Sequence, residues 1–117
     1  MTRRQYLSIL LVALIVLAGV AFLPNGVAKQ RAIAHEETYL DTQLANESCL
    51  TSYGTAETTS RTRASVVDYG LTSRTVRVHH AYWFSTEELD ADVSSVATYV
   101  VTLDSVRRVD GETVTPC

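Results

Sequence analysis

Positive charge is scarce in most of this chain of 117 residues. Lys29 is its only lysine, and from Ala28 onward 13 acidic residues stand against 8 basic ones. Nucleic-acid affinity depends largely on clustered lysine and arginine. The composition therefore argues against a nucleic-acid partner, and the length leaves room for one small domain behind the apolar start.

Recognisable catalytic and metal-binding motifs are also missing. The chain has no glycine-rich phosphate loop and no G-x-S-x-G turn. The segment HEETY (35–39) departs from the zinc-protease pattern H-E-x-x-H, because Tyr39 stands where the second histidine ligand belongs. The carboxylates of EELDAD (87–92) do not continue into an EF-hand loop. We therefore predict a non-catalytic protein with no catalytic residues, no metal ligands and no cofactor.

One long apolar run is present. Between Tyr6 and Leu23, Ser8 is the only strongly polar side chain. As a helix this run is about 27 Å long, close to the ~30 Å hydrocarbon core of a bilayer. Arg3 and Arg4 in front of it favour a cytoplasmic N-terminus. We expect residues 1–27 to form a single-pass transmembrane anchor in the cell membrane, with the rest of the chain extracytoplasmic.

A cleaved signal peptide is the alternative to a retained anchor. The triplets 26–28 (GVA) and 32–34 (AIA) carry small residues where a signal peptidase reads them. The apolar run is nevertheless longer than the ~7–15 residues usual for a signal peptide. Both interpretations export everything after residue 28, and cleavage would make the protein secreted.

Residues 28–48 predict a short juxtamembrane amphipathic helix. The segment Pro24-Asn25-Gly26 should separate it from the apolar run. The apolar stripe is too short for sustained heptads, which favours a helix that packs on the following domain over one that forms oligomers. The stripe has near-helical spacing and consists of Ala32, Ile33, Tyr39, Leu40 and Leu44.

Cys49 and Cys117 are the only cysteines. In an oxidising compartment, two cysteines of a small exported domain most often bond to each other. A bridge that closes nearly 70 residues is worth roughly 4 kcal/mol in the chain-entropy model, in a domain too small to be secure alone. We predict the Cys49–Cys117 disulfide, with an intermolecular bridge or free thiols as alternatives.

A modification motif precedes the first cysteine. Asn46-Glu47-Ser48 fits the N-glycosylation pattern. Asn46 falls in an expected exposed junction and is the candidate acceptor.

Residues 49–117 predict a small disulfide-closed antiparallel β-sheet domain, so that the whole chain is α+β. Segments 60–69 and 74–85 are rich in β-branched and aromatic residues, and the loop 70–73 joins them as a hairpin. Segment 97–106 is a further strand, and 50–60 is an edge strand or loop. Asp110-Gly111 is a two-residue hairpin signal.

One short helix is expected between these strands, over residues 85–97. Leu89, Val93 and Val96 recur there at helical spacing. Ser85 and Glu88 fit a capping box at its start.

The segment HHAYWF (79–84) holds the candidate binding residues. Side chains of a strand alternate between two faces, so His79 and His80 diverge, which argues against a shared metal. One face carries Val76, Val78, His80, Tyr82 and Phe84 and resembles core; the other carries Arg77, His79, Ala81 and Trp83. Interfaces favour tryptophan, tyrosine and arginine. Beside plain structural packing, we therefore consider a partner-binding patch of Trp83, Tyr82, Arg77 and His79.

These features favour a small membrane-anchored envelope protein whose β-rich domain binds another protein or a surface layer. Its expected contacts are membrane lipid through the N-terminal helix and another envelope protein, and an oligomer is compatible with them. A secreted small domain, as an enzyme or inhibitor, is a further hypothesis.

An apolar N-terminal helix, an amphipathic helix and a disulfide-closed sheet together resemble the plan of type IV pilins. The resemblance implies a structural subunit of a surface filament. The start MTRRQYLSILL lacks the glycine before the apolar run and the glutamate after it that mark many pilins. Pro24-Asn25-Gly26 also interrupts the long helix that pilins contain.

Overall fold

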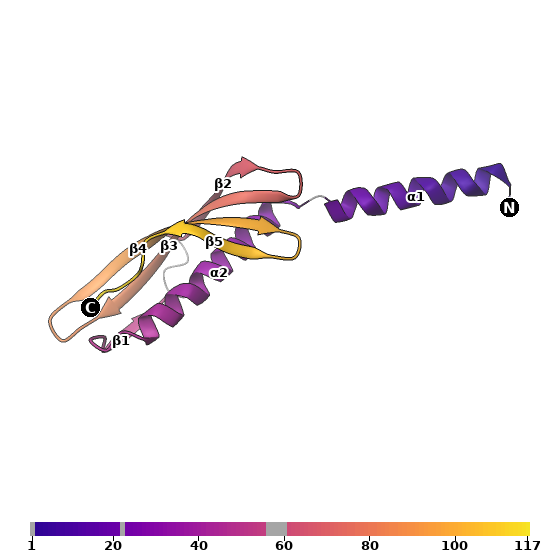
Figure 1. Ribbon diagram of the computed structural model, residues 1–117. Helices are drawn as coiled ribbons and strands as arrows, with labels where there is room; N and C mark the ends of the chain where they lie inside the picture. Colours follow the sequence, from indigo (N-terminus) through magenta and orange to yellow (C-terminus); the bar gives the residue numbers. More distant parts are fainter. Residues whose placement is uncertain (1, 22, 56–60) are drawn as a thin grey trace.

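The computed structural model describes residues 2–21, 23–55 and 61–117 and has an α+β fold with one antiparallel sheet (Figure 1). The α+β class predicted from the sequence is confirmed. The elements are α1 (Arg3–Ala21), α2 (Asn25–Ala45), β1 (Ser52–Gly54), β2 (Arg63–Tyr69), β3 (Ser73–Ser85), β4 (Asp90–Thr102) and β5 (Val106–Gly111). We call α2 together with the five strands the head.

Helix α1 extends away from the head (Figure 1). Within the part of the chain that the structure describes, no helix combines the length and the apolar character needed to cross a membrane. The expected transmembrane helix is therefore not found.

Strands β3 and β4 form the long central hairpin of the sheet. Each has 13 residues, and they pair from Ser73 opposite Thr102 to Ser85 opposite Asp90. Both β1 and β2 pair with the other edge of β3, while β5 pairs only with the Ala97–Val101 part of β4. The hairpin predicted at 70–73 is confirmed, since β2 and β3 are antiparallel neighbours.

The prediction of a short helix over residues 85–97 is wrong, because most of this segment belongs to β4. Its ladder to β3 satisfies the backbone along the whole strand, which outweighs the helical spacing of a few apolar residues. The expected capping box is replaced by a turn: the Thr86 hydroxyl accepts hydrogen bonds from the backbone N–H groups of Glu88 and Leu89 at 3.3 and 3.1 Å.

The hairpin expected at Asp110-Gly111 is also wrong. Gly111 is the last residue of β5, with a φ of 148° that suits glycine. The Asp110 side chain accepts a hydrogen bond from the Gly111 N–H at 2.9 Å. The turn between β4 and β5 lies instead at Leu103–Ser105, where the Thr102 hydroxyl accepts a hydrogen bond from the Ser105 N–H.

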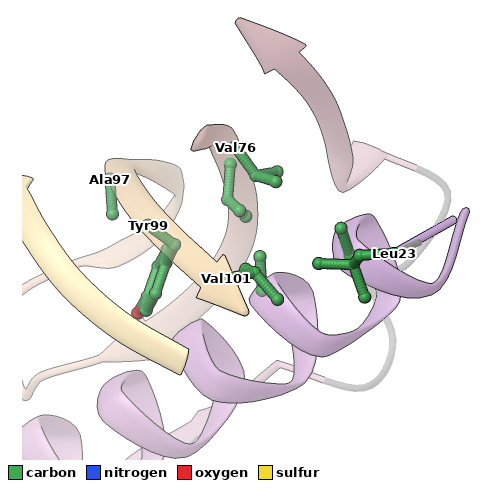
Figure 2. Packing of buried hydrophobic residues seen from close by; sticks show 8 residues of the cluster. Leu23, Val76, Ala97, Tyr99 and Val101 are labelled. Atoms are coloured by element: carbon green, nitrogen blue, oxygen red, sulfur yellow. The ribbon is translucent and has the colours of Figure 1, made fainter. Parts of the chain in front are cut away.

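Helix α2 covers one face of the sheet, which we call the inner face (Figure 1). It begins at Asn25 rather than at residue 28, directly after Pro24, whose φ of −63° is fixed by its ring. Figure 2 shows Tyr99 and Val101 pointing from the sheet toward the helix. The core between the two layers contains Leu23, Ala28, Ala32, Val76, Val78, Ala97, Tyr99 and Val101.

The predicted disulfide between Cys49 and Cys117 is confirmed, with Cα atoms 5.9 Å apart. It joins the segment after α2 to the end of the chain. A second apolar cluster lies close to it and contains Leu40, Leu44 and Val114. The bridge therefore holds the C-terminal segment against the C-terminal part of α2.

Candidate functional site

The face of the sheet opposite α2, which we call the outer face, carries three of the four candidate binding residues. Along Arg74–His80 buried side chains alternate with half-buried or exposed ones, as the strand pattern predicted. The alternation ends there, because Ala81, expected on the outer face beside His79 and Trp83, is buried as well. Arg77 is exposed, and His79 and Trp83 are half-buried. In the described part of the chain no helix packs on this face.

A basic patch lies at the centre of the outer face. Arg63 on β2 is the register partner of His79, and His79 is in turn the partner of Val96 on β4. Arg77 lies two residues before His79 on β3, so it is on the same face, and its register partner is Thr98. Among the described residues, neither arginine forms an ion pair.

Trp83 lies at the far end of the outer face, where its indole packs against the backbone of Gly54. A Cβ atom at Gly54 would meet the indole Nε1 at 2.7 Å, so any larger residue here would displace the Trp83 ring. Asp92, the register partner of Trp83, forms an ion pair with Arg61 beside it. A surface cavity of about 360 Å³ adjoins Trp83 and is lined by Phe84, Ser85, Asp90, Ala91 and Asp92 as well.

Tyr82, the fourth candidate, is separated from the other three because its side chain lies on the inner face. It packs on the apolar cluster of Leu40, Leu44 and Val114. Burial, together with the charge of Glu112, raises the pKa of the Tyr82 hydroxyl. The sheet therefore does not bring all four residues into one patch.

The candidate glycosylation residue Asn46 is the C-cap of α2 and is exposed. Its backbone N–H donates to the carbonyl of Gln43 at 3.2 Å, which ends the helix. Ser48 of the motif is exposed as well. Because Asn46 is exposed, the fold is compatible with its glycosylation, which remains a prediction.

The structure also contains a buried polar cluster that the sequence did not lead us to expect. Glu36 is completely buried between α2 and the sheet. Its Oε1 accepts from the Ser95 hydroxyl at 3.1 Å, and its Oε2 accepts from the Tyr99 hydroxyl. The Arg108 Nε donates to Oε2 at 3.1 Å and completes an ion pair.

Arg108 connects this cluster to the C-terminal segment. Its guanidinium lies 4.0 Å from the centre of the Tyr39 ring and donates to the Glu112 carbonyl at 2.8 Å. Burial works against its charge, but hydrogen bonds and the charge of Glu36 outweigh that effect and raise the pKa of Arg108. The hydroxyls of Ser95 and Tyr99 and the Arg108 guanidinium all donate to the Glu36 carboxylate, so both of its oxygens are engaged. The cluster is suited to holding layers together.

A regular spacing in α2 would have been the signal for this cluster. The buried residues of the helix are Ala28, Ala32, Glu36, Leu40 and Leu44. Residues four apart share one helix face. Glu36 therefore occupies the centre of an otherwise apolar stripe, and a carboxylate there implies a buried partner.

Tyr99 gives the cluster a measurable pH dependence. Burial and the hydrogen bond to Glu36 raise the pKa of its hydroxyl above the ordinary value of about 10. Above pH ~10 the unfolded chain releases this proton while the folded protein keeps it, so the stability of the fold should fall with rising pH, by up to about 1.4 kcal/mol per pH unit. We expect Tyr99→Phe to flatten this alkaline slope in denaturant unfolding. An identical slope in the variant would contradict the assignment.

Comparison with protein-family models, with curated proteins and with solved structures finds no match to this chain.

Proposed function

We propose that this chain is a non-catalytic protein of the cell envelope whose exported head binds another protein through its outer face. The observation that carries the proposal is the division of the sheet into two unlike faces. The inner face holds the apolar core against α2, whereas the outer face displays Arg63, Arg77 and His79 with Trp83 at its end. Arginine and tryptophan are enriched at protein interfaces, and Trp83 is held in place by its packing on Gly54.

Export of the head is supported by the disulfide, because such bonds persist in oxidising compartments and are rare in the cytosol. The apolar N-terminal segment supports delivery to a membrane. Large exposed apolar patches mark sites that contact a membrane or another protein. The exposed apolar residues of α1 include Leu7, Ile9, Leu10, Leu11 and Val12. We propose that α1 contacts membrane lipid, and the intact mass of the native protein tests the alternative of a cleaved, secreted head.

A filament subunit is the second candidate. It is supported by an N-terminal helix that extends away from the head with exposed apolar side chains (Figure 1). Stacking of such helices would bury these side chains between copies. Subunits recovered from sheared surface filaments would favour this candidate.

In-cell photo-cross-linking tests the proposed binding surface. A photoreactive amino acid in place of Arg77 is expected to give an adduct with a protein, and the same group at Thr42, which is exposed on α2, is the matched control. Trp83→Ala should lower the yield of the Arg77 adduct by about thirtyfold, the effect of losing a hot-spot residue worth about 2 kcal/mol. The head should also be digested when protease is added to intact cells.

Equal adduct yields at Arg77 and Thr42, or no adduct at either, would contradict binding through the outer face. A head that resists protease until the cells are lysed would contradict export.

A further inference from the structure

The β3–β4 turn presents a compact acidic tip. Its backbone is closed by a hydrogen bond from the Thr86 N–H to the Leu89 carbonyl at 2.8 Å, and the Thr86 hydroxyl accepts two more. Glu87, Glu88 and Asp90 are exposed around Leu89, which is itself 53% exposed. Among the described residues none of these carboxylates forms an ion pair. We call residues 87–90 the acidic tip.

The basic patch on the outer face, formed by Arg63, Arg77 and His79, is the chemical complement of this tip. The whole chain carries a net charge of −3, so the patch is a local reversal of sign. Asp68 on β2 and Asp110 on β5 also lie on the outer face, and among the described residues neither forms an ion pair with Arg63 or Arg77. The half-buried Val96 beside the arginines offers an apolar contact.

From this complementarity we propose that the outer face binds the acidic tip of a second copy of the chain. Glu87 and Glu88 of one copy pair with Arg63 and Arg77 of the other, and Leu89 packs on Val96. Within one head the two surfaces cannot meet, because they lie at different places along the same rigid β3–β4 hairpin. The inference rests on the proposed function, since it names the protein that this face binds.

Charge reversal in the full chain provides the test. The face variant is Arg63→Glu with Arg77→Glu, and the tip variant is Glu87→Arg with Glu88→Arg. Sedimentation velocity in a non-ionic detergent should show that the natural chain self-associates and that rising salt weakens this association. Each variant alone should associate about a hundredfold more weakly, because like charges then meet. An equimolar mixture of the two variants should associate again, because each tip then meets a face of opposite charge.

The matched control is Arg3→Glu with Arg4→Glu, which makes the same change of charge on α1 and should leave association unchanged. Failure of the mixture to associate, or equal association of all the variants, would overturn the proposal. The identity of the Arg77 cross-link separates this inference from the proposed function. An adduct between two copies supports both, an adduct with a different protein overturns only the self-binding, and no adduct overturns both.

Discussion

Replacing Cys49 and Cys117 by serine is expected to lower the free energy of unfolding by about 4 kcal/mol. The bridge closes a loop with a sequence separation of 68, and in the chain-entropy model a loop of this size restricts the unfolded chain by roughly that amount. Both cysteines are exposed, so the substitutions create no cavity in the core. Urea unfolding of the full chain in a mild detergent, with the natural protein beside the double variant, measures the difference.

Reduction of the natural protein is the control for this experiment. The reduced protein and the double variant should have the same unfolding midpoint, because both lack only the cross-link. A variant as stable as the oxidised protein would contradict a stabilising role for the bridge. The expected loss is large for a small head, since the net stability of a domain is typically only about 5–15 kcal/mol.

The features that could be predicted from the sequence depend on local pattern. Alternation along 74–85 placed Val76, Val78 and His80 in the core and Arg77 on the other face, because each strand residue points to the side opposite its neighbours. The two cysteines could be paired because no other cysteine was present. The helix predicted over residues 28–48 was found, but it begins at Asn25 and ends at Ala45, so both ends lie earlier than predicted.

The features that were missed depend on partners distant in sequence. Residues 85–97 carry an apolar spacing that is compatible with a helix, and only pairing with the whole of β3 makes the segment a strand. The role of Glu36 depends on Arg108, 72 positions later, and on Tyr99. Strand alternation already places Tyr82 and Trp83 on opposite faces. What the sequence did not show is that Tyr82 packs on an apolar cluster that includes Val114 from the C-terminal segment.

Replacing Glu36 by alanine is expected to lower the free energy of unfolding by about 3–5 kcal/mol, the usual result of breaking a buried ion pair from one side. The substitution leaves the guanidinium of Arg108 and the hydroxyls of Ser95 and Tyr99 without their common acceptor. Unpaired buried donors are costly because water cannot replace the lost partner. Glu37→Ala is the matched control, since the half-buried Glu37 accepts a hydrogen bond from the Thr55 hydroxyl at 3.3 Å, outside the cluster around Glu36.

A double-mutant cycle decides whether the ion pair or the packing of α2 carries this effect. If the pair carries it, Glu36→Ala together with Arg108→Ala should cost clearly less than the sum of the two single losses, because removing one partner already forfeits the interaction. Arg108→Ala keeps a loss of its own, since the guanidinium also lies over Tyr39 and binds the Glu112 carbonyl. Strictly additive losses would mean that Glu36 and Arg108 act independently. In that case α2 would be held to the sheet mainly by the apolar clusters on either side of Glu36, with the buried carboxylate adding little beyond its own hydrogen bonds.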